Sequence, residues 1–172
     1  MKAYTKGFTL VELLVVISII AILLGMMMPN YFGVKENARV VSARTGAKGL
    51  ETAFKSYLDN YRVWPSAFVD GPINNDIFKA LRGDKTTTFN PQGIAFYEFP
   101  NYTNSSMSQK AWDSWSSPND PTTWQSYRVM FDKNYDNTID ALPNVYRSVV
   151  VYSVGKNRED EQGGGDDVAS WK

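Results

Sequence analysis

The sequence predicts an α+β protein in which one long N-terminal α-helix packs on a small antiparallel β-sheet with long loops. Three observations support this fold class. Residues 8–28 form an apolar run, an amphipathic pattern with helical spacing continues to about residue 63, and β-rich segments appear only in the second half of the chain. With 172 residues, the chain is long enough for one such domain with a single modest core.

The composition excludes several classes of functional site. The chain contains 18 basic and 18 acidic side chains, no Cys and no His. Disulfides, Cys-based metal sites and catalytic arrangements that depend on His or Cys are therefore impossible. Without a long basic stretch, there is no electrostatic reason to expect nucleic-acid binding. We also expect no enzymatic activity, because no convergent acid, base and nucleophile can be identified.

The first part of the predicted helix contains a single charged side chain, Glu12, within residues 8–28. At about 1.5 Å per residue this run would span about 31 Å, which matches the hydrocarbon core of a bilayer. Lys2 and Lys6 precede it, so the positive-inside rule predicts a cytoplasmic leader and an exported remainder. A secretory signal peptide would have a shorter apolar region and a small-residue cleavage site, which residues 26–30 do not provide. A plain membrane anchor would not explain the carboxylate.

The helix is expected to continue from the apolar run to about Val63. Pro29 predicts a kink, because proline removes a backbone hydrogen bond. Beyond it, apolar residues recur at three- and four-residue spacing on one face, opposite a charged face. These apolar positions are Ala47, Leu50, Phe54, Tyr57, Leu58 and Tyr61. Trp64-Pro65 is expected to end the helix.

The second half of the chain predicts a small globular region. A short helix is expected in residues 74–84, capped by Asn75 or Asp76 and stopped by Gly83. Residues rich in Ser, Asn, Pro and Trp at 101–123 predict a loop, and the tail from Gly155 is polar. The candidate strands are Ile94 to Phe99, Tyr127 to Phe131 and Ser148 to Val154.

Residues 6–13, KGFTLVEL, resemble the signature of type IV prepilins. In that family a membrane peptidase cleaves after the glycine, and the new N-terminal residue is N-methylated. The resemblance therefore implies cleavage between Gly7 and Phe8 and N-methylation of Phe8. It also implies a role in assembly for Glu12, which is the fifth residue after the cleavage point.

Physical chemistry suggests why an assembly role needs both Phe8 and Glu12. A free amine on Phe8 and an unpaired Glu12 carboxylate would each be costly in an apolar environment. Pairing them between neighbouring subunits relieves both costs and sets the stagger between adjacent helices. We expect Glu12→Val to insert into the membrane but to assemble poorly. The alternative is that Glu12 extends to the membrane interface and has no such role.

The resemblance divides the chain into four parts. Residues 1–7 form a prepilin leader peptide, residues 8–29 the transmembrane half of the helix, residues 30–64 its amphipathic continuation and residues 65–172 a globular head. Such a precursor would lie in the bacterial inner membrane with its head in the periplasm. It would later enter a periplasmic or surface filament.

The whole chain is similar to the major, G-type pseudopilin of type II secretion systems. Residues 61–65, 127–137 and 153–172 carry this similarity. It implies a structural subunit of a periplasmic pseudopilus, polymerised through its N-terminal helix to drive protein export. The implied partners are further copies of the chain, a prepilin peptidase and methyltransferase, an inner-membrane assembly platform, minor pseudopilins and, before assembly, membrane lipid.

Two other functions remain open. A major or minor pilin of a type IV pilus would use the same subunit design, although the missing Cys pair favours a pseudopilus because many pilin heads close their last loop with a disulfide. A membrane-tethered module could bind carbohydrate or protein through aromatic side chains, but it would not need the Gly7-Phe8 junction or Glu12. Core packing is the favoured interpretation of these aromatic residues: Tyr97, Tyr102, Trp112, Trp115, Trp124 and Tyr127.

The resemblance to the pseudopilin implies a calcium site in the C-terminal loop. The corresponding ligands are Asn157, Asp166 and Asp167, with backbone oxygens near Val154 and Gly164. Clustered carboxylates and flexible Gly carbonyls suit calcium, which prefers about six to eight oxygen ligands. Asn157 stands where the family usually has Asp, and a solvated acidic, Gly-rich loop is the alternative.

A second acidic segment, residues 132–140, begins like a calcium-binding loop. However, Asn137 stands where an EF-hand has Gly, and Pro143 stands at the twelfth position, where an EF-hand has Glu. We therefore interpret this segment as a β-turn region rich in Asp and Asn.

Overall fold

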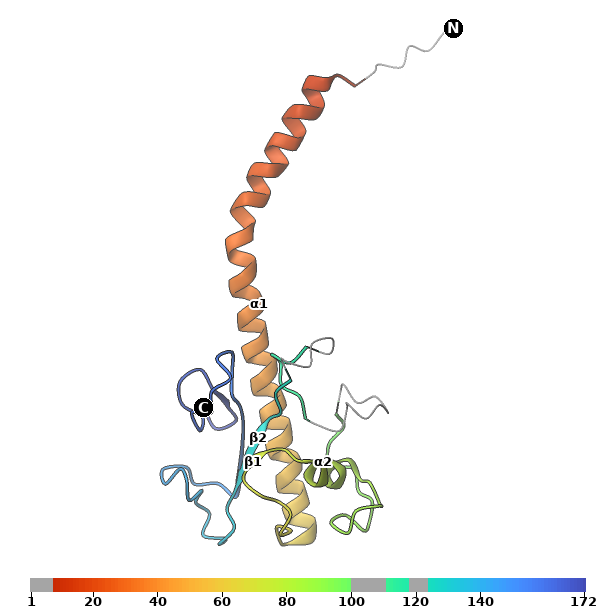
Figure 1. The fold of residues 1–172 in the computed structure, drawn as a ribbon, viewed down its shortest axis with the longest axis vertical. Helices are drawn as coiled ribbons and strands as arrows, with labels where there is room; N and C mark the ends of the chain where they lie inside the picture. The colour runs from red at the N-terminus through yellow and green to blue at the C-terminus, as the bar shows by residue number, and fades with distance from the viewer. Residues whose placement is uncertain (1–7, 100–110, 118–123) are drawn as a thin grey trace. The chain divides into compact units, whose positions relative to one another are not determined.

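The structure is a computed structural model that describes residues 8–99, 111–117 and 124–172. The chain divides into two compact units, Met1–Ala38 and Arg39–Lys172. The long helix α1, Leu10–Tyr61, contributes residues to both units (Figure 1). The predicted leader, residues 1–7, lies outside the described residues.

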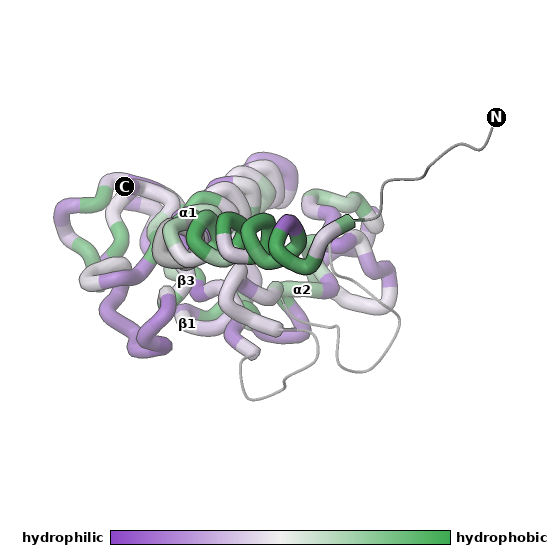
Figure 2. Tube along the Cα trace, turned by 90° about the horizontal axis from the view of Figure 1, so that it is seen from above, coloured by the Kyte–Doolittle hydropathy of each residue, from purple (hydrophilic) through white to green (hydrophobic). Residues whose placement is uncertain are grey.

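In the first unit, α1 exposes its apolar side chains. From Phe8 to Met26, the large apolar side chains are 45–87% exposed, and Figure 2 shows the N-terminal turns of α1 coloured as almost wholly hydrophobic. The helix runs through Gly25 and Pro29 without interruption. The kink expected at Pro29 therefore does not break the helical backbone. The predicted transmembrane half, residues 8–29, includes positions whose side chains lie outside the described part. Within the described part, no helical segment is both long and apolar enough to cross a membrane.

In the second unit, α1 buries one face. Side chains at three- and four-residue spacing on this face are fully or almost fully buried: Ala43, Ala47, Leu50, Phe54 and Tyr57. The helix ends at Tyr61, followed by Arg62 in the left-handed conformation with φ of 62°. The Arg62 amide donates to the Leu58 carbonyl at 2.7 Å. The helix therefore ends within two residues of the predicted position.

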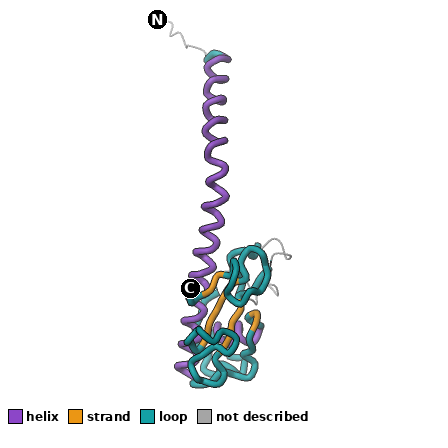
Figure 3. The backbone as a smooth tube through the Cα atoms, turned by 90° about the vertical axis from the view of Figure 1, so that its left-hand side faces the viewer, coloured by secondary structure: helices purple, strands orange, loops and turns teal. Residues whose placement is uncertain are grey.

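A four-stranded antiparallel sheet has the strand order β1-β2-β3-β4. Figure 3 shows the strands in orange. Two of the strands, β2 (Arg128–Phe131) and β3 (Val149–Ser153), confirm the predicted ones to within one residue at each end. The other two, β1 (Gly71–Pro72) and β4 (Val168–Ala169), were not predicted. Each has only two residues, and Gly-Pro is a poor β-forming pair, so no alternating pattern marks them.

Both faces of the sheet are covered. Alternate residues Val129 and Phe131 in β2 pack in the main core with α1, where the rings of Phe131 and Phe54 lie 5.3 Å apart. The intervening Met130, together with Val150 and Tyr152 in β3, packs on the other side in a second cluster. The long helix and the small antiparallel sheet confirm the predicted α+β fold class.

The short helix α2, Asn75–Arg82, is capped one residue earlier than predicted. The side chain of Asn74 accepts a hydrogen bond from the Ile77 amide at 2.9 Å, whereas Asn75 and Asp76 belong to the helix. Gly83, with φ of 83°, ends α2 as expected.

The strand predicted for residues 94–99 is wrong. The amides of Phe96 and Tyr97 both donate to the carbonyl of Leu81, at 2.8 and 3.1 Å. This segment therefore donates hydrogen bonds to a carbonyl group at the C-terminal end of α2 instead of pairing with the sheet.

A buried side chain, Asn90, joins three parts of this unit. Its Nδ2 donates to the carbonyls of Ala80 and Ile94, at 2.6 and 2.7 Å. Its Oδ1 accepts from the Ile94 amide at 3.1 Å and from the Tyr61 hydroxyl at 2.6 Å. The ends of α1 and α2 are thus connected to the same turn through one amide group.

Candidate functional site

The start of α1 is fixed by reciprocal hydrogen bonds between Thr9 and Glu12. The Thr9 amide and hydroxyl donate to Oε2 of Glu12, at 2.9 and 2.7 Å. In return, the Glu12 amide donates to the Thr9 hydroxyl oxygen at 3.2 Å. This arrangement is a capping box, in which two otherwise unsatisfied amides at a helix start find side-chain acceptors. The carboxylate also lies in the first turn, where the helix dipole favours negative charge.

Glu12 therefore has a structural role within its own chain, as the cap of α1. The sequence argument assigned it to assembly and missed the cap, although the Thr-x-x-Glu spacing that signals a capping box is present. Phe8 is exposed at the start of the described chain, and Gly7 lies outside the described residues. The processing and assembly roles of these three residues remain predictions.

The N-terminal segment matches a known protein family. Residues 2–28 match the family model of the prokaryotic N-terminal methylation motif. The type IV major pilin protein PilE of Neisseria gonorrhoeae is 31% identical over 104 residues, which is 55% of this chain and 62% of that protein. Fimbrial protein EcpC of Eikenella corrodens is 31% identical over 106 residues, covering 55% of this chain and 69% of that protein. The chain belongs to the type IV pilin-like family.

The pilin-like chain is similar to these relatives over part of their length. It spans 62% and 58% of two major pilins of Neisseria gonorrhoeae. The type IV major pilin protein PilA of Myxococcus xanthus is 40% identical over 52 residues, which is 30% of the pilin-like chain. No solved structure matches the chain significantly. The relatives are structural subunits, which supports the expectation of no enzymatic activity, and they are named as pilins rather than as pseudopilins.

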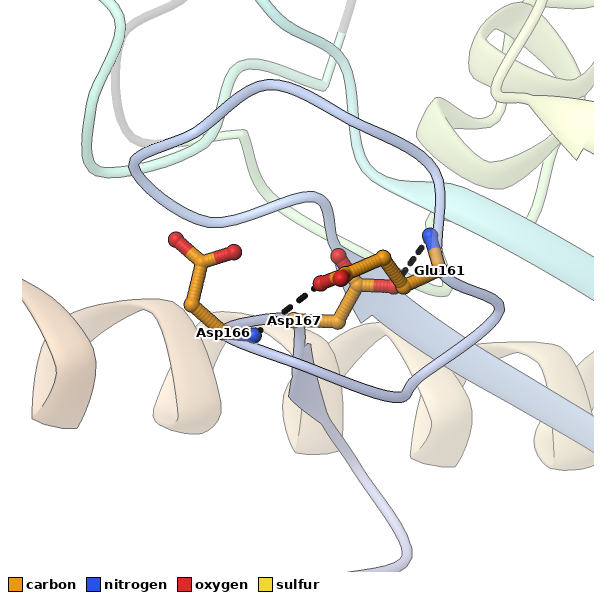
Figure 4. A group of neighbouring side chains, drawn as sticks. All are labelled: Glu161, Asp166 and Asp167. Carbon is orange, nitrogen blue, oxygen red and sulfur yellow. Dashed lines mark hydrogen bonds between the residues drawn. The ribbon is translucent and has the colours of Figure 1, made fainter.

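The C-terminal loop of this pilin-like chain contains a cluster of three carboxylates, which we call the acidic triad: Glu161, Asp166 and Asp167 (Figure 4). One carboxylate oxygen from each lies within 4.8 Å of the others. Backbone amides also hold these side chains: Oδ2 of Asp166 accepts from Lys156 and Asn157, at 2.8 and 3.0 Å. Three carboxylates this close together could hold a metal ion.

Asp167 is the buried member of the triad. Only 7% of this residue is exposed, and its Oδ2 accepts from the amides of Glu161 and Gly163, at 3.1 and 2.8 Å. Its Oδ1 is buried and has no hydrogen-bond partner among the described residues. Burial raises the pKa of Asp167, and the amides of Gly163 and Glu161 offset part of this increase. This unpartnered oxygen fits the donor set of a cation site.

The triad includes two of the predicted metal ligands and one residue that was not predicted. Asp166 and Asp167 come together, whereas Glu161 was missed because its contact depends on the turn through the intervening glycines. Asn157 lies nearby, but its Oδ1 accepts from the Glu159 amide at 2.8 Å. The Gly164 carbonyl accepts from the Asp167 amide at 2.9 Å, and Val154 is buried. Ligand roles for Asn157, Val154 and Gly164 remain predictions.

The aromatic residues that a ligand platform would use lie largely in the packed interior. Trp115 and Tyr127 are buried, and the Tyr127 hydroxyl donates to the Ala43 carbonyl at 3.3 Å. The rings of Trp112 and Trp124 lie 5.0 Å apart, with both side chains half-buried. Tyr102 lies outside the described residues. This placement supports core packing over a ligand platform.

Proposed function

We propose that the chain is a subunit of a type IV pilus filament. In this proposal the precursor lies in the bacterial inner membrane with its head in the periplasm, is cleaved between Gly7 and Phe8, is N-methylated on Phe8 and polymerises through α1. One observation carries the proposal: residues 8–26 expose their large apolar side chains around a single carboxylate, Glu12, inside the segment that matches the methylation motif.

The exposed apolar surface is the physical reason for polymerisation. Apolar area in contact with water is unfavourable, and a continuous patch of this kind marks a surface that other molecules cover. Lipid covers it before assembly, and the same segments of other copies cover it afterwards. The similarity to type IV major pilins favours a pilus over the pseudopilus of a type II secretion system, which uses the same subunit design.

The geometry of Glu12 is compatible with both a cap and a contact to a neighbour. Both bonds from Thr9 fall on Oε2, so Oε1 is the oxygen that can receive a positively charged amine. In the filament, the methylated amine of Phe8 from a neighbouring copy pairs with this oxygen. The cap keeps the carboxylate in the first turn, and the charge pair sets the stagger of the helices.

Substitutions at Glu12 and Thr9 separate these two roles. Glu12→Gln keeps a side-chain acceptor for the cap but removes the charge, whereas Thr9→Ala removes the cap and keeps the charge. We expect filaments, counted by electron microscopy, to be lost in Glu12→Gln and Glu12→Val but reduced less in Thr9→Ala. Asp59→Asn removes one exposed charge elsewhere on α1 and serves as the matched control. Normal filaments from Glu12→Gln would contradict the charge pair.

Two measurements test the processing and the type of filament. The intact mass of the filament subunit should lack residues 1–7 and include one added methyl group. A strain that lacks the chain should lose surface filaments and keep protein export. Lost export with surface filaments intact would instead favour the type II pseudopilus.

We also infer that the acidic triad binds calcium, with Asn157 and the carbonyls of Val154 and Gly164 as further ligands. The buried, unpartnered Oδ1 of Asp167 supports this inference. Calcium should raise the melting temperature of the full chain in detergent, because binding to the native state stabilises it. Glu161→Gln should abolish most of this shift. An equal shift in Glu161→Gln and the wild type would argue against the triad.

A further inference from the structure

We propose that Trp171 is a positioning residue for the acidic triad and that it sets the affinity of this cluster for calcium. The proposal rests on the calcium site described above and adds a residue that does not itself bind the metal. Trp171 packs against the second cluster of the sheet, and its indole ring contacts Gly163 in the turn between the carboxylates of the triad. Trp171 thus connects the sheet to the candidate site.

Gly163 is the point at which Trp171 meets the C-terminal loop. A Cβ added to Gly163 would overlap the Trp171 ring, so the ring lies directly against the glycine backbone. Gly163 also has φ of 81°, a conformation that residues with a side chain rarely adopt. The Lys172 ammonium donates to the carbonyl of the same glycine. Two neighbouring side chains therefore hold Gly163 in place.

The backbone of Gly163 in turn orients Asp167. Its amide donates to Oδ2 of Asp167 at 2.8 Å. Because this bond occupies one oxygen of the buried carboxylate, Oδ1 is the oxygen that remains for a cation. Groups that orient a metal ligand through a hydrogen bond typically change the metal affinity by about 10–100-fold. Trp171 acts one step further from the metal, through the glycine on which it packs.

A second anchor holds the same turn at Asp160. Its Oδ1 accepts from the Tyr152 hydroxyl at 2.8 Å, and its Oδ2 accepts from the Arg128 guanidinium at 2.6 Å. These donors belong to β3 and β2. The rings of Tyr152 and Trp171 also meet edge-on, with centroids 6.1 Å apart. The sheet therefore holds the turn at both Asp160 and Gly163.

Glu161 lies between these two anchors. Its amide donates to Oδ2 of Asp167, and its Oε2 accepts from the Asp166 amide, both at 3.1 Å (Figure 4). Three consecutive glycines, residues 163–165, separate Glu161 from the two aspartates along the chain. Glycine loses more conformational freedom on ordering than any other residue, so a turn without anchors would hold the three carboxylates together poorly. Anchoring the turn lowers the entropic cost of ordering the triad around an ion.

Removal of the indole ring should weaken calcium binding without removing any ligand. We expect Trp171→Ala to raise the calcium Kd about tenfold or more, the effect typical of residues that orient metal ligands. Trp171→Phe keeps a ring against Gly163 and should restore most of the affinity. Tyr152→Phe removes only the hydroxyl that holds Asp160, so it should raise the Kd less. Since it keeps the packing of the ring, Tyr152→Phe is also the variant that best preserves the fold.

Calcium titration by calorimetry on the full chain in detergent measures these dissociation constants. Trp124→Ala is the matched control, because it removes another half-buried Trp ring outside the C-terminal loop and should leave the Kd unchanged. The melting temperature of each metal-free variant is measured alongside. A purely structural role for Trp171 would lower the melting temperature and leave the Kd of the folded chain unchanged.

The outcomes separate the positioning role from the calcium site. No binding by the wild type up to about 10 mM, well above the range of extracellular calcium modules, would overturn the calcium site and the role of Trp171 with it. Binding by the wild type that Trp171→Ala and Tyr152→Phe leave unchanged would overturn the positioning role alone.

Hydrogen exchange in the metal-free chain tests the anchoring of the turn independently of calcium. The Gly163 amide should lose protection in Trp171→Ala and keep it in Trp124→Ala. Equal protection in the two variants would show that Trp171 does not hold the turn and would overturn the proposal.

Discussion

The two parts of α1 differ in what covers their apolar side chains. Residues 10–26 are apolar on all sides, and their large side chains are exposed. Residues 43–57 are apolar on one face, and that face is buried in the core of the same chain. One continuous helix thus combines a segment that packs in the core of its own chain with a segment whose large apolar side chains are exposed. Stability of the chain and assembly of the filament should therefore respond to different substitutions.

The packed part of α1 also depends on small residues. Gly46 and Gly49 face Tyr127 and Tyr97, and a Cβ added to Gly46 would overlap the Tyr127 hydroxyl. Ala43 and Ala47 are fully buried on the same face. Small side chains here allow the aromatic residues to approach the helix backbone closely.

The largest effect on stability is expected for Phe54→Ala. Phe54 is 0% exposed and makes edge-on contacts with the rings of Trp64, Phe68 and Phe131. Its removal leaves a cavity, which should lower the free energy of unfolding by about 3–5 kcal/mol. Urea unfolding of the full chain in detergent, followed by Trp fluorescence, measures this loss. A loss below about 1 kcal/mol would mean that this part of α1 is not packed as described.

A smaller loss is expected for Gly46→Ala. The added methyl group must displace the buried Tyr127 ring, so overpacking should cost about 1–3 kcal/mol. Gly33→Ala is the matched control, because no atom lies within 4 Å of its added Cβ. The same unfolding assay compares the two variants, and equal stability would show that Tyr127 can move at little cost.

Glu51→Gln should have an effect that depends on pH. This buried carboxylate, 4% exposed, accepts from Lys55 at 2.6 Å and from Arg147 at 2.5 Å. Burial acts to raise the pKa of Glu51, but hydrogen bonds from Lys55, Ser170 and Arg147 outweigh it and lower the pKa below its usual 4.5. At neutral pH the loss should be about 1–2 kcal/mol, because both basic partners are partly solvated.

The sign of this pH dependence follows from the lowered pKa. The ionised Glu51 contributes its full stabilisation above about pH 4.5 and loses it as the pH falls through the folded-state pKa. The difference between wild type and Glu51→Gln should therefore shrink on acidification. A difference that grows below pH 4.5 would contradict the ion pairs.

The smallest effect on stability is expected for Leu14→Ala in the exposed part of α1. Leu14 is 62% exposed, so its truncation should change the free energy of unfolding by no more than about 0.5 kcal/mol. Filament yield should fall, because in the proposed filament this side chain belongs to the surface that other copies cover. A clear loss of stability with normal filament yield would reverse the roles of the two parts of α1.

The sequence predicts the elements whose pattern is local. Helical periodicity located α1, the β-branched run of Val149 to Val151 located β3, and Gly83 marked the end of α2. Residues 94–99 were misassigned as a strand because an apolar run does not reveal that its backbone amides donate to the Leu81 carbonyl. The short strands β1 and β4 arise from pairing with β2 and β3, which the local sequence does not encode.

The candidate sites show the same difference between features with a local sequence pattern and features that depend on tertiary contacts. The cost of a lone carboxylate in an apolar run was enough to single out Glu12, and the acidic, Gly-rich tail was enough to single out Asp166 and Asp167. Glu161 joins them only through the way the C-terminal loop closes. That closure is a property of the tertiary structure and is not encoded in the local sequence.

The bonds of Asn90 have a consequence for the durability of the protein. Spontaneous deamidation of Asn would replace Nδ2 by an oxygen, which would then face the carbonyls of Ala80 and Ile94 without a proton to share. The usual route requires attack by the next backbone nitrogen, which in Pro91 carries no hydrogen. The sequence thus places at this junction an amide that is protected against the usual route of deamidation.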